Sequence, residues 1–366
     1  MNPPKPLSRR PKVSVIIPVY NAQDYLKQCM DSIIGQTIRD IEIICIDDQS
    51  TDNSLEILQQ YAIRDSRIKV IKQEKSGAGA ARNKGLKFAS GEYLSFLDAD
   101  DFFEPNMLEK AYSAGVQNMS DIVVFRSDIY DNVKKKFIPN FSTIRTDLIP
   151  KKKSFCFKDL KNDIFRVFIG WAWDKLFLRD FVISHQLYFQ EQRTTNDLFF
   201  VFSALVKSKN ITILDDVLAH HRSNVSSLST SREESWLCFY HALLALKDFL
   251  IANNVYKDVE QSFINYALHF SLWNLNTMNG SAYKNLYQKL RLEIFHELGI
   301  DRYDSSYFWH KSEYNQYLKI MNNNIIVDDN RQTHSICKKI ISPFASIRNN
   351  GIKYVMYKVK YHILKK

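Results

Sequence analysis

Three aspartates lie close together at the end of an apolar segment. The stretch YLSFLDADD, residues 93–101, ends in Asp98, Asp100 and Asp101. Carboxylates about 4 Å apart repel one another by roughly 1 kcal/mol in water and by about 4 kcal/mol at the effective dielectric of a protein surface. Such a cluster is tolerated where a cation lies among the carboxylates or where the loop is open to water. A cation site and a solvated turn are therefore the two interpretations of this stretch.

Polar residues also follow the neighbouring apolar segments. The run VSVIIPVYN contains Pro18 and Tyr20 near its end, and IEIICIDD ends in Asp48. The small-residue stretch SGAGAARNKG, residues 76–85, opens a predicted helix that carries Arg82. Each of these, taken alone, is typical of a solvated turn. Their recurrence at successive segment ends indicates one shared site.

Another carboxylate precedes an apolar helical pattern. In FQEQRTTNDLFFVFSAL, residues 189–205, Asp197 stands directly before Leu198 and Phe199. A carboxylate at this place can cap the helix by accepting hydrogen bonds from its first backbone N–H groups. It can also act as a general base, which removes a proton from a reacting group. The residues alone leave both interpretations open.

The elements that must position these side chains alternate over the first 130 residues. Apolar runs begin at positions 13, 41, 68, 93 and 121, which is the spacing of βαβ units. Between them, apolar side chains recur at helical spacing in residues 23–34 and 52–64. Because the runs are apolar almost throughout, we expect strands buried on both faces of a mostly parallel sheet. The sequence therefore predicts a doubly wound α/β fold whose ligands bind at the carboxyl ends of the strands.

Composition and targeting signals narrow the class of protein. The chain has 366 residues, is 45% hydrophobic and contains only 10 glycines, which excludes fibrous and low-complexity material. Its five cysteines are scattered without a CxxC pair, which suits a reducing cytoplasm and offers no zinc site. The N-terminal residues have no apolar core of a signal peptide, and no apolar run approaches the ~20 residues that cross a bilayer. We expect a cytoplasmic protein, peripheral at the inner face of the cell membrane.

The net charge of +10 is concentrated in one segment. Residues 331–366 hold nine Lys and Arg and no Asp or Glu, so the rest of the chain is nearly neutral. A neutral body without a binding motif argues against a nucleic-acid partner. On a helix, Ile352, Val355 and Val359 share an apolar stripe flanked by lysines. This basic amphipathic tail is predicted to bind an anionic membrane surface, or else to pack its stripe on the protein's own helical region.

The order of four motifs resembles that of the family 2 glycosyltransferases. The motifs are VSVIIPVYNAQDYLKQCMDSIIGQT, IDDQSTDNS, SGAGAARNKGL and GEYLSFLDADD. The resemblance is close over residues 12–115 and extends weakly to about residue 228, where it is to bacterial surface-polysaccharide members. It implies the Rossmann-like GT-A fold and inverting transfer of a sugar from a nucleotide-diphosphate donor, a UDP-sugar, to a hydroxyl of a glycan or lipid-linked glycan.

The resemblance also implies what the strand-end residues do. Pro18 and Tyr20 would lie at the nucleotide base, and Asp48 would accept a hydrogen bond from the uracil N–H. Arg82 would offer its planar fork to the base or the diphosphate. Asp98 would touch the ribose and share with Asp100 a metal ion bridging the two phosphates; oxygen ligands and phosphate suit Mn²⁺ or Mg²⁺. The crowded acids would then be tolerated because a cation accompanies the donor.

The resemblance also implies functions for two further segments. There an acidic pair occurs where this chain has Asn196 and Asp197, so Asp197 would be the general base with a neutral neighbour. The segment GWAWDKLF resembles one on the acceptor side, so Trp171, Trp173 and Asp174 are candidate acceptor residues; the indoles can instead belong to the core.

The sequence LAHHRS stands where relatives carry aromatic residues followed by arginine. His221 and Arg222 are therefore predicted to contact the diphosphate. A structural use of this histidine pair remains the alternative, and a zinc site lacks a third ligand at suitable spacing.

These patterns predict an organisation in segments. We expect an N-terminal extension, a GT-A domain, a helical region and the basic tail, at residues 1–11, 12–230, 231–330 and 331–366. The GT-A domain would divide near residue 130 into a nucleotide-sugar half and an acceptor half. An NAD-dependent dehydrogenase is excluded, because GxGxxG is missing after the first predicted strand. A nucleotide-sugar-binding module without catalysis remains the alternative, which the carboxylate of Asp197 disfavours.

Overall fold

The computed structural model describes residues 10–223 and 232–322, which group into two compact units. Unit 1 contains Met1–Asn140, Lys152–Cys156 and Gly170–Asn224, and unit 2 contains Phe141–Lys151, Phe157–Ile169 and Val225–Lys366. Two stretches of the predicted acceptor half therefore group with the helical unit. The domain limits given above stay a prediction, and the basic tail lies outside the described residues.

Unit 1 is built on one mixed sheet in the order β3-β2-β1-β4-β9-β6-β10-β5, with β7 on β6 and β8 on β10. The strands are β1 Val13–Val19, β2 Ile41–Asp47, β3 Ile68–Lys72, β4 Tyr93–Phe96, β5 Phe102–Phe103, β6 Ile122–Asp131, β7 Lys136–Pro139, β8 Ser154–Phe155, β9 Lys175–Leu178 and β10 Ile211–Ser223.

The first four strands of that order are parallel, as the βαβ spacing predicted. In β2 and β4 the side chains are buried on both faces, which explains why these runs are almost continuously apolar, whereas the edge strand β3 is only partly buried. Strand β9 then enters antiparallel between β4 and β6, and β10 runs parallel to β6. The register of β10 shifts between Leu214 and Val217, so its two acids lie in a bulge. The mostly parallel sheet with flanking helices confirms the predicted fold class.

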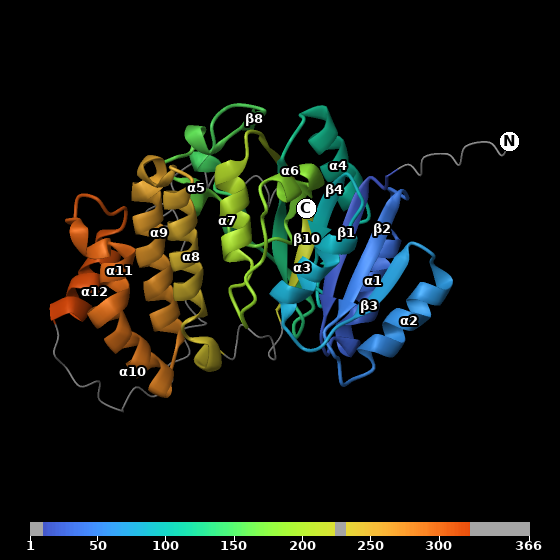
Figure 1. Ribbon diagram of the computed structural model, residues 1–366, viewed down its shortest axis with the longest axis horizontal. Helices are drawn as coiled ribbons and strands as arrows, with labels where there is room; N and C mark the ends of the chain where they lie inside the picture. The colour runs from blue at the N-terminus through green and yellow to red at the C-terminus, as the bar shows by residue number, and fades with distance from the viewer. Residues whose placement is uncertain (1–9, 224–231, 323–366) are drawn as a thin grey trace. The chain divides into compact units, whose positions relative to one another are not determined.

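Helices cover both faces of this sheet (Figure 1). They are α1 Gln23–Ile34, α2 Ser54–Arg64, α3 Ala78–Phe88, α4 Met107–Gln117, α6 Arg179–Ser184 and α7 Leu198–Lys207. Helices α1, α2 and α4 form one core with the side chains on one face of β1, such as Val15 and Ile17. On the opposite face Phe96 packs its ring against Phe189 and Phe200, which brings the segment before α7 under the sheet. Two packed layers thus fix the strand ends in place.

Unit 2 is mostly helical, as predicted for residues 231–330. Its helices are α5 Ile164–Val167, α8 Cys238–Ala252, α9 Tyr256–Thr277, α10 Gly280–Lys289, a π-helical stretch Leu290–Ile294, α11 Phe295–Leu298 and α12 Lys311–Asn322. Among the described residues one helical stretch, Glu233–Ala252, is by length and composition apolar enough to cross a bilayer, although it carries two glutamates, a lysine and an aspartate. Its side chains Leu243 and Leu246 are fully buried in unit 2, where α8 contacts α9, which is also the property of a core helix.

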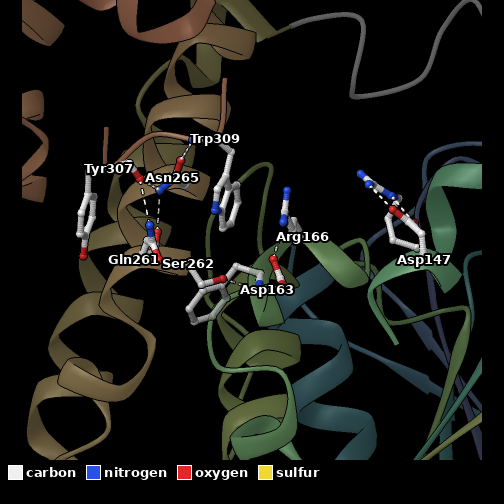
Figure 2. A network of polar contacts seen from close by, with 10 residues as sticks. Asp147, Asp163, Arg166, Gln261, Ser262, Asn265, Tyr307 and Trp309 are labelled. Carbon is white, nitrogen blue, oxygen red and sulfur yellow. Dashed lines mark hydrogen bonds and ion pairs between the residues drawn. The ribbon is translucent and has the colours of Figure 1, made fainter. Parts of the chain in front are cut away.

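A polar network ties α5, α9 and the segment before α12 together within unit 2 (Figure 2). The amide of Asn265 donates to the carbonyl of Tyr307 at 3.0 Å and accepts from the backbone N–H of Trp309 at 2.7 Å. Asp163 pairs with Arg166, whose guanidinium lies 3.9 Å from the ring centre of Trp309. Opposite charges and satisfied amides therefore stabilise this packing.

Candidate active site

The three aspartates form an acidic edge directly after β4. Asp98 is about one-third exposed (29%), Asp100 is half-buried and Asp101 is fully buried. Asp101 turns inward, where it accepts a hydrogen bond from the backbone N–H of Arg222 at 2.8 Å and lies 3.1 Å from Nδ1 of His221. These contacts join the acidic edge to the end of β10. Asp101 therefore has a structural role, independent of any ligand.

Crowding changes the protonation of the acidic edge. Burial, together with the charges of Asp101 and Asp98, raises the pKa of Asp100 to about 7, although the nearby His221 opposes the shift. Burial also raises the pKa of Asp101. A raised carboxyl pKa means that the ionised form is disfavoured without a further positive charge. A cation bound beside the edge would lower these carboxyl pKa values.

His221 supplies one positive charge to this edge. Burial alone would lower its pKa, but the charge and hydrogen bond of Asp101 and the charge of Asp100 outweigh burial and raise the pKa to about 9. Its ring stacks on Trp173, with centroids 5.3 Å apart. At neutral pH His221 is thus an imidazolium held between carboxylates and an indole.

Arg222 is buried and its donors point into the protein. Its Nε donates to the carbonyl oxygen of Asp100 at 2.8 Å, and its two terminal nitrogens donate to Asn132 and Gln28 at 2.9 and 2.6 Å. In this conformation the guanidinium shapes the backbone of the acidic edge. Contact with a diphosphate stays a prediction for both His221 and Arg222.

The predicted base-binding residues lie at the ends of β1 and β2. Asp48 is buried, and its carboxylate accepts hydrogen bonds from the backbone N–H groups of Ser76 and Gly77, each at 2.8 Å. Asp48 therefore holds the small-residue loop that leads into α3. The exposed ring of Tyr20 lies beneath Lys75, whose Nζ donates to its hydroxyl at 2.7 Å.

Pro18 is half-buried in β1, opposite Ile46 of β2. It therefore belongs to the same strand-end surface as Tyr20 and Asp48.

Arg82 connects two of the predicted functional segments. The side chain is buried; Nη2 forms an ion pair with Oδ1 of Asp98, and Nη1 donates to Oδ1 of Asn196 at 2.7 Å. Its Nε has no hydrogen-bond partner among the described residues. A buried N–H without a partner is costly, so this donor fits an anionic ligand such as a phosphate.

Asp197 occupies the N-cap position of α7, but its carboxylate makes no capping hydrogen bond there. Burial raises its pKa to about 6; the charge of Arg82 opposes the rise and that of Asp98 adds to it. An uncapped carboxylate with a pKa near neutrality suits proton abstraction at physiological pH. The helix-capping interpretation therefore loses its basis.

The candidate acceptor residues form an aromatic cluster with a buried ion pair beside it. Trp171 and Trp173 are stacked with centroids 4.8 Å apart; Trp171 is half-buried and Trp173 is buried. Asp174 is fully buried, and Nζ of Lys175 binds its Oδ1 at 2.6 Å and the carbonyl of Trp171 at 2.7 Å. Of the three candidate acceptor residues, Trp171 is the one whose side chain is partly exposed.

The carboxylates of the acidic edge could hold a divalent cation only if a substrate phosphate supplied further oxygen ligands. Within residues 10–223 and 232–322, no group of three or more His, Cys, Asp or Glu side chains is arranged to hold a metal. The carboxylates of Asp98 and Asp100 are hard oxygen donors, and Mg²⁺ is commonly bound by one or two carboxylates plus substrate phosphates. These residues therefore fit a cation that arrives with a diphosphate.

Several residues of this region carried no assigned function in the sequence. Asp101 was one of the three acids, but its partners His221 and Arg222 lie about 120 residues away. Asn83 binds the backbone of Phe189 at 2.8 Å, across more than 100 residues. No local spacing signals contacts of such long range; for Asn83, the only sequence signal was its position beside Arg82.

The sheet and its acidic edge define an α/β protein whose candidate site lies where parallel strands end. Residues 14–183 match the family described as "Glycosyl transferase family 2". Over 294 residues the chain is 33% identical to EpsH of Bacillus subtilis, which is named as a glycosyltransferase; the match covers 77% of this chain and 81% of EpsH. The chain belongs to glycosyltransferase family 2.

Two further similarities extend this result. The cholesterol galactosyltransferase of Borreliella burgdorferi is 34% identical over 229 residues, which are 60% of this chain and 62% of that protein. The crystal structure of residues 1–349 of S. aureus TarS matches with a TM-score of 0.57 at 21% identity, covering 83% of this chain and 91% of that 1–349 chain. The structural likeness confirms the GT-A fold.

Proposed function

We propose that this chain is an inverting glycosyltransferase that moves a hexosyl or N-acetylhexosaminyl group from a nucleotide-diphosphate sugar, a UDP-sugar, to a hydroxyl of a glycan or lipid-linked glycan. The observation that carries the proposal is the convergence of the acidic edge, the buried guanidinium of Arg82 and the uncapped carboxylate of Asp197. TarS of S. aureus, which shares the fold, has a structure in complex with UDP-GlcNAc, which supports a nucleotide-sugar donor. The chondroitin synthase of Escherichia coli is 42% identical over 103 residues, which are 28% of this chain and 15% of that protein, and its name supports a place in bacterial surface-polysaccharide synthesis.

The donor would lie across the strand ends. Tyr20 offers an exposed ring for the base. Oδ1 of Asp48 already accepts from the backbone of Ser76 and the amide of Gln73, so a uracil N–H would bind Oδ2, beside the backbone N–H of Gly77. The free Nε of Arg82 and the imidazolium of His221 bring positive charge toward a diphosphate. Asp98 and Asp100 would hold Mn²⁺ or Mg²⁺, which when bound stabilises the charge of the leaving nucleoside diphosphate.

The reaction would be a single displacement. The carboxylate of Asp197 takes the proton of the acceptor hydroxyl while the hydroxyl oxygen forms a bond to the anomeric carbon. The bond from that carbon to the diphosphate oxygen breaks, and the nucleoside diphosphate leaves with the electron pair. Attack opposite the leaving group inverts the anomeric configuration. Trp171, supported by Trp173 and Asp174, offers a ring face to the acceptor.

The deciding experiment measures turnover of a panel of UDP-sugars and other nucleotide sugars with Mn²⁺, for the wild-type chain and Asp197→Asn. General base catalysis contributes about 10²–10⁴-fold, so the variant should lose kcat by that factor. Calorimetric binding of UDP should be unchanged. Binding of UDP without turnover of any donor by the wild type would instead favour a nucleotide-sugar-binding module, and full kcat in Asp197→Asn would remove the base assignment.

A further inference from the structure

The segment leading to Asp197 is fastened to α3 at both of its ends. At its start, Oδ1 of Asn83 accepts from the backbone N–H of Phe189, and Nδ2 of Asn83 donates to the carbonyl of Phe189, both at 2.8 Å. At its end, Nη1 of Arg82 donates to Oδ1 of Asn196 at 2.7 Å. Two consecutive residues of one helix therefore hold the whole segment 189–196.

The segment itself is closed and strained. The backbone N–H of Gln190 donates to the carbonyl of Asn196 at 3.1 Å, which joins its ends. Gly79 lies so close that an added Cβ would stand 2.0 Å from the carbonyl oxygen of Gln190. Thr195 has a φ of +58°, a conformation that is rare for a β-branched residue and costs on the order of 1–3 kcal/mol. Such a conformation persists only where the surrounding contacts impose it.

The same guanidinium also reaches the acidic edge. Nη2 of Arg82 pairs with Asp98, while Nη1 binds Asn196, the residue before Asp197. Because Asn196 is neutral, its amide can accept this hydrogen bond without competing with Asp98 for the charge of Arg82. One side chain thus links the donor side of the site to the residue next to the carboxylate.

We propose that Asn83 and Asn196 are positioning residues, which together with Arg82 hold the carboxylate of Asp197 in register with Asp98. This inference rests on the proposed function of Asp197. Neither asparagine touches the reacting atoms. Their loss displaces the base while leaving the strand-end contacts of the donor in place, so the effect falls on kcat.

The test compares Asn83→Ala, Asn196→Ala and the double variant, using the UDP-sugar that the wild type turns over fastest. A displacement of about 1 Å can cost 10²-fold in rate, so each single variant should lose kcat by about 10–100-fold. The KM for the UDP-sugar and the calorimetric Kd for UDP should change less than about threefold. Because both side chains hold one segment, the double variant should lose little more than the worse single variant.

Asn210→Ala is the matched control. Asn210 is half-buried and its amide also binds backbone carbonyls, those of Asn118 and Met119, at the opposite edge of the sheet. It should lower Tm to an extent similar to Asn83→Ala and leave kcat unchanged. Wild-type kcat in both test variants, a kcat loss equal to that of the control, or fully additive losses would each overturn the inference.

Asp197→Asn in the same assay separates this inference from the proposed function. If Asp197→Asn is inactive while Asn83→Ala and Asn196→Ala keep their kcat, positioning fails and the base assignment stands. If Asp197→Asn keeps its kcat, the base assignment itself is wrong, and the inference falls with it.

Discussion

The acidic edge of unit 1 and the polar network of unit 2 are both partly buried clusters of charged and amide side chains, but they are built oppositely. In unit 2, Asp163 faces Arg166 and the amide of Asn265 is satisfied at both its oxygen and its nitrogen (Figure 2). In unit 1, three carboxylates are gathered. Asp98 pairs with Arg82 and Asp101 lies beside His221, yet burial and the acidic neighbours still raise the pKa of Asp100 to about 7. The first arrangement stabilises a fold, whereas under the proposed function a cation from outside the chain would complete the second.

The largest expected effect comes from breaking the acidic edge. Asp100→Asn should lower turnover at least about 10²-fold, because it removes a proposed ligand of the metal that would stabilise the developing charge by several kcal/mol. EDTA should abolish wild-type turnover and Mn²⁺ should restore it. Full activity of the variant, or turnover that is insensitive to EDTA, would contradict the metal assignment.

The same variant should be more stable than the wild type at pH 8 without metal. The folded pKa of Asp100 lies above the ordinary value of 3.8, so its ionisation favours the unfolded state. The stability that the protonated acid contributes is present below about pH 4 and is lost as the pH rises toward 7. The difference in Tm between Asp100→Asn and wild type should therefore grow over that range; a lower Tm of the variant at pH 8 would contradict it.

Breaking the network of unit 2 should lower the stability of the protein and leave donor binding unchanged. Asn265→Ala leaves the backbone N–H of Trp309 without its amide partner, which costs about 1–3 kcal/mol of unfolding free energy, whereas the carbonyl of Tyr307 keeps the hydrogen bond from Gln261. Denaturant unfolding measures this loss. The affinity for UDP, measured by calorimetry below the unfolding transition, should stay unchanged; a large change would show that the network also serves the donor site.

The pH dependence of turnover should show the raised pKa of Asp197. Burial raises that pKa to about 6, and only the ionised carboxylate accepts a proton, so kcat should be half-maximal near pH 6. Below that pH the rate should fall about tenfold per unit. A limb near pH 4, the ordinary range for an aspartate, would mean that the carboxylate lies in a more polar surrounding.

A third group of like charges, in the basic tail at residues 331–366, extends the comparison outside the described residues. If like charges again require a partner from outside, the tail should bind anionic liposomes in a salt-sensitive way, with about 1 kcal/mol for each basic residue near the surface. Cosedimentation of the full chain and of a version ending at Asn330 measures this. Equal pelleting of the two would favour packing of the tail on the protein itself.

The parts of the fold that depend on local pattern were predictable. The bounds of β1, β2, β3 and α1 coincide with the predicted segments. Their apolar runs and helical spacing can be recognised from neighbouring residues alone. The insertion of β9 between β4 and β6 was not, because KLFL is apolar in either direction of pairing. Strand β10 was not predicted because Asp215 and Asp216 interrupt its apolar pattern. Both acids lie in the bulge, where they are exposed to solvent.

The candidate site was likewise predictable only in part. Residue types at strand ends identified Asp98, Asp100 and Arg82 as neighbours, and the ion pair between Arg82 and Asp98 confirms that proximity. Their partners could not be identified, since Asn196 lies 114 residues from Arg82 and only the folded sheet brings them together. The chemistry assigned to each residue stays a prediction.

Gly79, where α3 lies against the carbonyl of Gln190, has a consequence for mutational libraries. Every missense change of its codon adds a Cβ, and a Cβ there would stand 2.0 Å from a backbone oxygen and 3.2 Å from Cβ of Asn196. Gly280 meets nothing within 4 Å, although its φ of +57° favours glycine or asparagine. In a saturation library selected for activity, all substitutions at codon 79 should disappear, whereas codon 280 should retain asparagine. Attempts to change the donor preference of this enzyme by directed evolution should therefore leave the first turn of α3 untouched.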